Sequence, residues 1–353
     1  MTLDDLLQGT GEWLRGEGPE VDVVVSTRIR LARNLADFPF PNRASALQRG
    51  EIESLLRERI LQLADSWQFC YFALHRLPEL DRQFLVERQL VSREHAHANG
   101  QRGVAIGKGE ASSIMVNEED HLRLQVIRSG FQLDDAWHEI NRLDDALSER
   151  VCYAFSEEFG FLTACPTNVG TGMRASVLLH LPALTLAKQL EKFFRALQKM
   201  NLVVRGLYGE GTRASGDFYQ ISNQVTLGRS EDEILRAIRE TVPAIVDYER
   251  HAREVLVREM RSALQDRIHR SLGTLRSARM MTSEETLDLL SNVRLGVALQ
   301  LLDDLTVPRI NELLLQTQPA HLQKLVGEEM DTDQQNIVRA RYLREQLRHV
   351  QLN

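Results

Sequence analysis

The chain has 353 residues, long enough for two domains, and its 43% hydrophobic and 26% charged residues are typical of a globular protein with a large core. A net charge of −7 argues against nucleic acid or an anionic membrane surface as a direct partner. Cys70, Cys152 and Cys165 are too few and too widely spaced for a disulfide framework or a zinc site, and the acidic N-terminal segment lacks the features of a signal peptide, so a reducing, cytoplasmic location is expected.

The first two thirds of the sequence mixes strand and helix patterns. A β-branched strand is expected at 21–33, where two following prolines end it. Apolar residues at helical spacing predict helices at 44–64, 132–149 and 184–200. Strand-like runs occur at 112–120, 121–128, 175–184, 201–211 and 217–228. Because helices and strands are interspersed without a regular alternation, the sequence predicts an α+β fold with a largely antiparallel sheet.

The character of the chain changes after about residue 231, where long, charged segments with helical periodicity begin. Pro308 and Pro319 stand where the first turn of a helix tolerates proline. We therefore expect two domains, an α+β domain at 1–255 and an all-helical domain at 256–353. The apolar stripes of the second domain are expected to form its core and a dimer interface.

Arginines recur at the ends of the expected strands. Arg28 and Arg30 are two positions apart, so they share one face of a strand. With Arg123, Arg174 and Arg205 they provide five cations, a set that fits a triphosphate held by side chains. The glycines and lysine at 103–109 do not have the spacing of a P-loop. Dispersed surface ion pairs remain the alternative for any single arginine.

Two further segments carry groups that suit catalysis. Glu118, Glu119 and Asp120 follow one another directly after an apolar strand, where they form either a solvated loop or a site at a strand end. Cys165 precedes Pro-Thr-Asn and two glycines that allow a ligand to approach the backbone closely. The alternative is that Cys165 is a small buried apolar residue beside a tight turn.

These segments together resemble the catalytic domain of the phosphagen (guanidino) kinases over roughly residues 20–250. The similarity lies in "STRIRLARNL", "NEEDHLR", "CPTNVGTGMRAS", "RGLYGEGT" and "YQISN", which occur in the usual order of the family. The segments "VVRGLYGEGT" and "FYQISNQ", with the helical tail, are most similar to the bacterial protein-arginine kinases of the McsB type. The resemblance implies a phosphagen-kinase-like sheet with flanking helices.

The resemblance also implies a role for individual residues. Glu119 corresponds to the catalytic glutamate, and Cys165 to the cysteine that contacts the acceptor guanidinium. The nucleotide-binding arginines correspond to Arg28, Arg30, Arg123, Arg174 and Arg205, with ATP and Mg²⁺ as the implied cofactors. Glu210 is the candidate for a second catalytic acid, whereas Arg213 replaces the acid that ends this segment in the small-molecule kinases.

Phosphagen kinases have a small helical domain before the strand of the "STRIR" segment, and this domain helps to enclose a free substrate. Here that strand begins near residue 23, so the sequence predicts a site without this cover. The expected substrate is therefore an arginine side chain of another protein. The resemblance implies a stress-response kinase that marks proteins for proteolysis. The alternatives are an adaptor or pseudokinase that delivers phosphoarginine proteins to an AAA+ protease, and a phosphagen kinase for a free guanidino substrate. The resemblance also implies a homodimer, with a McsA-type activator, a ClpC-type AAA+ unfoldase and a CtsR-type repressor as partners.

The tail differs from the pattern of these kinases. They carry an Arg-Asp-x-x-Arg-Ala motif that forms a second pocket for phosphoarginine, whereas this chain has Gln335, Asn336 and Arg339 at the corresponding positions. Neutral amides replace one cation and one anion, so the sequence predicts a degenerate pocket that binds phosphoarginine weakly.

Overall fold

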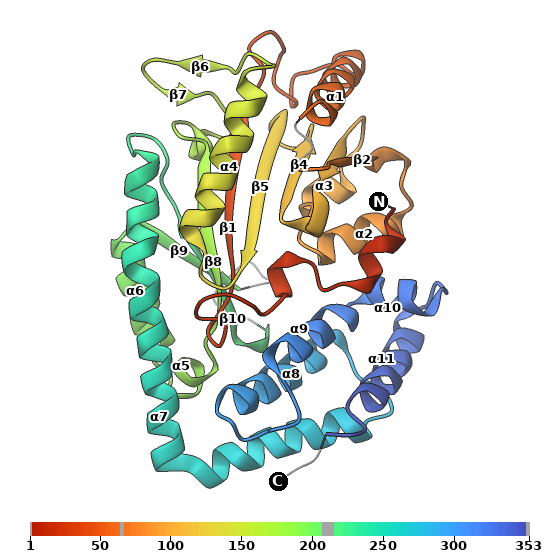
Figure 1. Ribbon diagram of the computed structural model, residues 1–353, viewed down its shortest axis with the longest axis vertical. Coiled ribbons are helices and arrows are strands. Elements are labelled where there is room, and N and C mark those ends of the chain that lie inside the picture. Colours follow the sequence, from red (N-terminus) through yellow and green to blue (C-terminus); the bar gives the residue numbers. More distant parts are fainter. Residues whose placement is uncertain (1, 64–66, 207–214, 351–353) are drawn as a thin grey trace.

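The computed structural model describes residues 2–63, 67–206 and 215–350. Its centre is an eight-stranded sheet (Figure 1). The strand order is β2 (Cys70–Ala73), β3 (Gly103–Ile106), β4 (Ser112–Val116), β5 (Leu122–Ser129), β1 (Val24–Arg33), β8 (Met173–His180), β10 (Phe218–Asn223) and β9 (Leu202–Gly206). All neighbouring strands pair antiparallel, which confirms the predicted α+β fold. Strands β6 (Phe155–Ser156) and β7 (Gly160–Phe161) form a separate hairpin.

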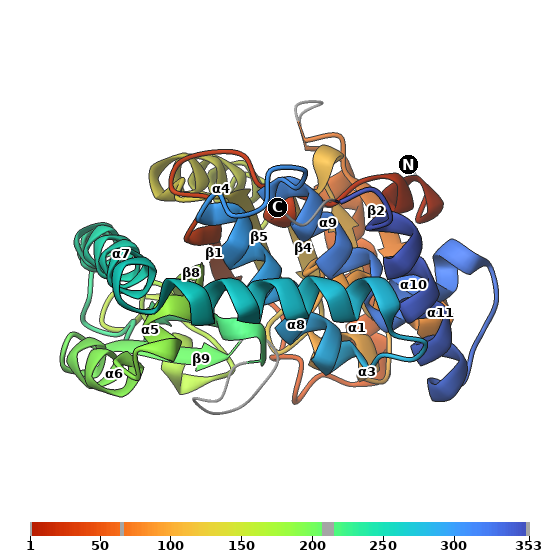
Figure 2. The ribbon, with the colours of Figure 1, turned by 90° about the horizontal axis from the view of Figure 1, so that it is seen from below.

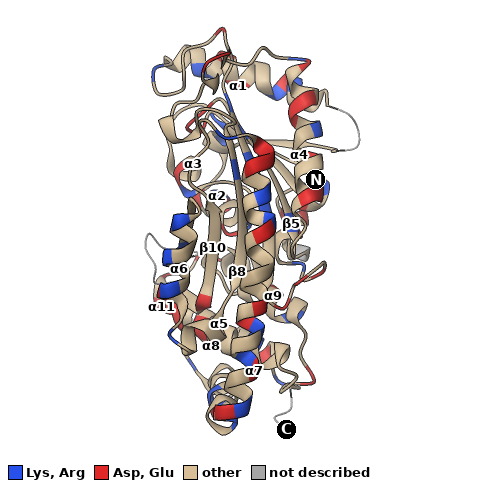
Figure 3. Ribbon diagram, turned by 90° about the vertical axis from the view of Figure 1, so that its left-hand side faces the viewer, with Lys and Arg blue, Asp and Glu red and all other residues tan. Residues whose placement is uncertain are grey.

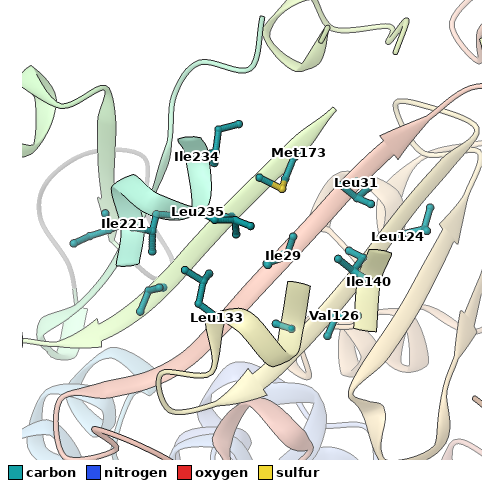
Figure 4. Close-up of a cluster of buried hydrophobic side chains, with 14 of the residues drawn as sticks. Ile29, Leu31, Leu124, Val126, Leu133, Ile140, Met173, Ile221, Ile234 and Leu235 are labelled. Carbon is teal, nitrogen blue, oxygen red and sulfur yellow. The ribbon is translucent and has the colours of Figure 1, made fainter. Parts of the chain in front are cut away.

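One face of the sheet is apolar along its whole length. The alternation of β1 directs Ile29 and Leu31 to this face, and β5 adds Leu124 and Val126. Helices α1 (Ala46–Leu61), α4 (Leu133–Ser148) and the first half of α7 (Glu231–Ser277) cover it. Figure 4 shows Ile140 of α4 among these side chains. This layer is the main core of the protein, and it fixes the positions of the central strands.

The opposite face of the sheet changes character along the strands. At one end it carries arginines, and at the other end it carries Val25, Ile127, Leu178 and Phe218. The C-terminal helices pack on this apolar end: α8 (Ser283–Ala298), α9 (Val307–Gln316), α10 (Pro319–Val326) and α11 (Thr332–Gln346). The helical region therefore shares its core with the sheet, so it lies beside the arginine-bearing surface.

Helix α7 connects the two predicted domains. It begins with a capping box in which Ser230 and Glu233 bond each other's backbone N–H groups. Its helical geometry breaks at Met260, and Figures 1 and 2 show that the second half turns away from the sheet and crosses beneath α8. The predicted boundary at residues 255 and 256 lies inside this helix, just before the break.

Shorter helices complete the fold around the edge strands. They are α2 (Glu79–Glu87), α3 (Arg93–His97), α5 (Pro182–Leu186) and α6 (Leu190–Lys199). A third apolar cluster joins Phe84 of α2, Met115 of β4 and Ala320 of α10, so the C-terminal region also contacts the far edge of the sheet. Charged residues of both signs follow the outer side of α7 (Figure 3). Among the described helices, none is both long and apolar enough to cross a membrane.

Candidate active site

The strand register brings the predicted arginines together. Arg30 pairs with Arg174 of β8 across one side of β1, and with Gln125 of β5 across the other. Arg123 is two positions before Gln125 on the same strand, and alternation keeps both on the face of Arg30. The five arginines expected to bind ATP line one cavity of about 1080 Å³: Arg28, Arg30, Arg123, Arg174 and Arg205.

The arginines make the floor of this cavity strongly electropositive. Burial lowers the pKa of Arg28 to about 10, and the neighbouring charges of Arg123 and Arg174 act in the same direction. Burial, Arg205 and Arg123 likewise lower the pKa of Arg174 to about 10. Burial also lowers the pKa of Arg30 well below its ordinary value. Arg28 and Arg174 remain cations at neutral pH, and a polyanionic ligand would relieve the repulsion among these side chains.

Several donors in this floor are available to such a ligand. The buried Nε atoms of Arg30 and Arg174 have no hydrogen-bond partner within the part of the chain that the structure describes. Arg28 is held differently, because its Nη1 donates to Gln89 Oε1 at 3.0 Å and its Nη2 to Gln220 Oε1 at 2.7 Å. Amide oxygens orient this guanidinium without neutralising it. The residues present therefore fit the phosphates of ATP.

The acidic loop at 118–120 gives each of its three residues a different environment. Glu118 Oε1 pairs with Arg123 Nη1 at 2.5 Å and accepts a bond from Ser92 at 2.7 Å. Burial acts to raise the pKa of Glu118, but Arg123 and these hydrogen bonds outweigh it and lower the pKa to about 2. Asp120 is 2% exposed and does not line the cavity. Glu118 and Glu119 both line the cavity, and Glu119 is the more exposed of the two.

Glu119 has the properties of a base. Partial burial raises its pKa, and the carboxylates of Asp120 and Glu118 raise it further, while Arg123 and a side-chain hydrogen bond with Cys165 oppose the shift. This hydrogen bond places the thiol of Cys165 beside the Glu119 carboxylate, and the role of the two residues in holding a guanidinium stays a prediction. The Sγ atom of Cys165 also contacts Thr167 Oγ1 at 3.0 Å.

The predicted second acid, Glu210, and Arg213 lie outside the described residues. Sequence reasoning did not find the two glutamines at Arg28 or the contribution of the C-terminal helices to the cavity. Ser283 and Glu284 of α8 and Gln318 before α10 line the same cavity as the arginines. Arg174 donates a hydrogen bond to Ser222 of β10, and Gln220 is two positions before Ser222. Strand alternation therefore places Gln220 on the face of the arginines, whereas no local pattern distinguishes Gln89.

The tail residues lie apart from this cavity. Arg339 is 1% exposed, and its guanidinium donates to the carbonyl oxygens of Thr317 and Met281 at 2.8 and 2.9 Å. Its Nη1 also donates to Asn336 Oδ1, and Gln335 Nε2 donates to the carbonyl of Met330. These contacts hold α11 against the preceding helices, and they agree with weak ligand binding by Arg339.

We expect the unmodified tail to bind free phosphoarginine weakly. Replacing Gln335→Arg together with Asn336→Asp should strengthen binding by roughly tenfold or more, because it restores a cation for the phosphate and an anion for the guanidinium nitrogens. Calorimetry with phosphoarginine measures both proteins. Tight binding by the unmodified chain that survives Arg339→Ala would place the pocket elsewhere.

Comparisons with known proteins agree with this arrangement. The profile of the ATP:guanido phosphotransferase C-terminal catalytic domain matches residues 51–252, and that of the protein-arginine kinase McsB C-terminal domain matches residues 261–353. The protein-arginine kinase of Halothermothrix orenii is 44% identical, with 98% of this chain and 99% of the relative covered. That of Symbiobacterium thermophilum is 47% identical, with 95% and 96% covered.

Solved structures extend the similarity to kinases of small guanidino compounds. A duplicated taurocyamine kinase from Schistosoma mansoni, with bound components of a transition-state analogue, superposes with a TM-score of 0.61 at 29% identity, covering 71% of this chain and 36% of that chain. A lombricine kinase gives a TM-score of 0.59 at 26% identity, with 67% and 68% covered.

Proposed function

The chain belongs to the protein-arginine kinase family of ATP:guanido phosphotransferases, and on that premise we propose that its cavity transfers the γ-phosphoryl group of ATP to arginine side chains of other proteins. The observation that carries this proposal is the placement of Glu119, bonded to Cys165, at the edge of a cavity with a floor of arginines. The phosphates of ATP and the guanidinium of the acceptor would thereby be bound side by side, as the reaction requires.

The chemistry assigns a distinct task to each group. A guanidinium is protonated at neutral pH, so it is a poor nucleophile. Glu119 orients the acceptor and takes the proton as the N–P bond forms and the bond from the γ-phosphorus to the bridging oxygen of ADP breaks. Cys165, as a thiolate stabilised by the substrate cation, supplies a second negative partner. The arginines hold the phosphates in place and stabilise the charge that ADP acquires.

Mg²⁺ is proposed to arrive with ATP. No group of three or more His, Cys, Asp or Glu side chains suited to a metal ion occurs within residues 2–63, 67–206 and 215–350. Mg²⁺ in kinases is commonly held by substrate phosphates with only one or two carboxylates, so the phosphates of ATP would supply most of its ligands here. When bound, the ion neutralises phosphate charge during transfer.

We also propose the cytoplasmic location and the partners expected from the sequence: a homodimer, a McsA-type activator, a ClpC-type unfoldase and a CtsR-type repressor. Exposed apolar side chains on the C-terminal helices and in the segment before α8 support protein–protein contacts there, because such side chains gain by leaving water. They are Met280, Leu325, Val326 and Ile337, with exposed fractions of 39–51%.

The choice of acceptor tests the proposed function. ADP release with Mg-ATP should be faster with an unfolded, arginine-containing protein than with free arginine at the same arginine concentration. The same protein with its arginines chemically blocked is the control and should give the background rate. Faster turnover of free arginine would instead assign the chain to kinases of small guanidino substrates.

Cysteine 165 should matter less than Glu119. Cys165→Ser is expected to lower kcat by roughly tenfold, because a hydroxyl keeps a hydrogen bond but loses the anionic partner of the guanidinium. Steady-state kinetics measures the loss, and peptide mapping during turnover examines residue 165. A stable phosphocysteine there would show a covalent role and contradict the assignment.

The dependence of activity on pH should reflect the ionisation of Glu119. Its pKa is raised above 4.5 by burial and by the neighbouring carboxylates, and only the ionised form accepts a proton. Activity is therefore present above the raised pKa and lost as the pH falls through it. The profile of kcat/KM for a protein substrate should give an apparent pKa above 4.5, with melting curves at each pH as the control for folding. A value at or below 4.5 would argue against Glu119 as the base.

A further inference from the structure

The loops that carry Glu119 and Cys165 come from distant parts of the chain and meet at one buried amide. Asn34 directly follows β1 and is 1% exposed. Its Nδ2 donates to Asp120 Oδ1 at 2.6 Å and to the carbonyl oxygen of Leu162 at 3.1 Å. The same Asp120 oxygen accepts the backbone N–H of Ala164 at 2.7 Å. Asn34 and Asp120 therefore bond to the segment that leads directly into Cys165.

The orientation of the Asn34 amide is fixed by its partners. The backbone N–H of His121 can only donate, so the oxygen of Asn34 faces it at 2.9 Å and the NH₂ group faces Asp120. His121 is held in turn, because its Nδ1 accepts the N–H of Leu35 at 3.0 Å and its Nε2 donates to the carbonyl of Pro39 at 3.1 Å. The C-terminal side of the acidic loop is thus tied to the segment that follows β1.

We propose that the Asn34–Asp120 pair positions the Glu119 carboxylate against the Cys165 thiol. Neither residue lines the cavity, so the pair acts through the two loops and not on the reacting atoms. Asp120 is adjacent to Glu119, and Ala164 is adjacent to Cys165, so a shift of this pair moves both groups of the proposed guanidinium clamp. The assignment rests on the proposed roles of Glu119 and Cys165.

A positioning role is distinguishable from a general contribution to stability. Arg28, Arg30 and Arg174 project from central strands whose register does not depend on this pair. Loss of the pair should therefore lower kcat and leave the KM for ATP nearly unchanged. Displacement of reacting groups by as little as about 1 Å costs as much as 10²-fold in rate. A general loosening of the fold would instead change both readouts, and the ATP-binding stoichiometry from calorimetry corrects kcat for any loss of folded protein.

The polarity of the pair allows a sharp test with a conservative control. Asn34→Asp places two carboxylates in contact and turns an oxygen toward the carbonyl of Leu162. Asp120→Ala removes the oxygen that accepts from both Asn34 and Ala164, whereas the amide oxygen of Asp120→Asn can still accept both bonds. Asn34→Asp and Asp120→Ala should each lower kcat roughly tenfold or more, and Asp120→Asn should keep most of the activity.

A readout independent of phosphoryl transfer separates this proposal from the proposed function. The rate of alkylation of Cys165 by iodoacetamide, followed by peptide mapping against pH, reports the hydrogen bond with Glu119. The exposed Cys152 is the internal control. In Asn34→Asp and Asp120→Ala the pH profile of Cys165 should shift while that of Cys152 stays in place, and Asp120→Asn should leave both profiles in place, even in a chain that phosphorylates no protein.

Three results would overturn the proposal. The first is an unchanged kcat and an unchanged Cys165 profile in Asn34→Asp and Asp120→Ala. The second is an equal loss in kcat and in ATP affinity. The third is unfolding of both of these variants in melting experiments, since a pair whose loss unfolds the chain is a structural element and not a positioning device.

Discussion

Replacing Glu119 by glutamine is expected to lower kcat for protein phosphorylation by about 10²–10⁴-fold, the usual effect of losing a general base. The amide keeps the shape of the side chain, but it cannot accept the guanidinium proton. ATP binding should change little, because Glu119 bonds to Cys165 and pairs with none of the arginines that form the floor.

Calorimetry with ATP and single-turnover kinetics together check this result. The matched control is Glu139→Gln on α4, a carboxylate that pairs with Arg128 away from the cavity and should leave kcat unchanged. Activity of the Glu119 variant within a few fold of the unmodified chain would mean that another group takes the proton. Glu210 would then be the first residue to replace.

The arginine floor carries the second large expectation. Arg28→Ala, Arg123→Ala and Arg174→Ala should each raise the KM for ATP by roughly ten- to a hundredfold and slow turnover, because each removes a charge-assisted hydrogen bond to the phosphates. Arg123→Ala should also release Glu118 from its ion pair, which adds an uncompensated carboxylate to the cavity. Its effect is therefore expected to be the largest of the three.

Titration calorimetry measures the loss of ATP affinity in each variant. Arg236→Ala is the matched control, because this arginine lies exposed on α7 and pairs with Asp232 in the neighbouring turn of the same helix. Its removal should leave ATP binding unchanged. Unchanged affinity in all three floor variants would show that the phosphates bind elsewhere.

Strand alternation was sufficient to predict part of the site. It placed Arg28 and Arg30 on one face, and the structure confirms that both line the cavity. The meeting of Arg30 with Arg174 depends on the pairing of β1 with β8, which are far apart in the sequence. Sequence periodicity contains no information about that register, so the convergence rested on family resemblance alone.

The C-terminal region shows a second limit of sequence reasoning. Its helices were predicted, but Val25, Ile127, Leu178 and Phe218 form part of its core, and these belong to four different strands of the sheet. Each lies on the same face of the sheet as the arginines. An apolar residue there predicts that this position is buried, but it does not predict which helix covers it. The tail arginine, Arg339, was expected in a degenerate pocket, and its bonds to backbone carbonyls depend on contacts between helices that a sequence motif does not describe.

The most direct test of the central claim is mass spectrometry, under non-acidic conditions, of an unrelated unfolded protein incubated with this chain and Mg-ATP. The mass of one phosphoryl group should appear on arginine side chains and disappear after acid treatment, because the N–P bond is acid-labile. The Glu119→Gln variant should give almost none. Phosphate on hydroxyl side chains only, or on free arginine but on no protein arginine, would contradict the assignment.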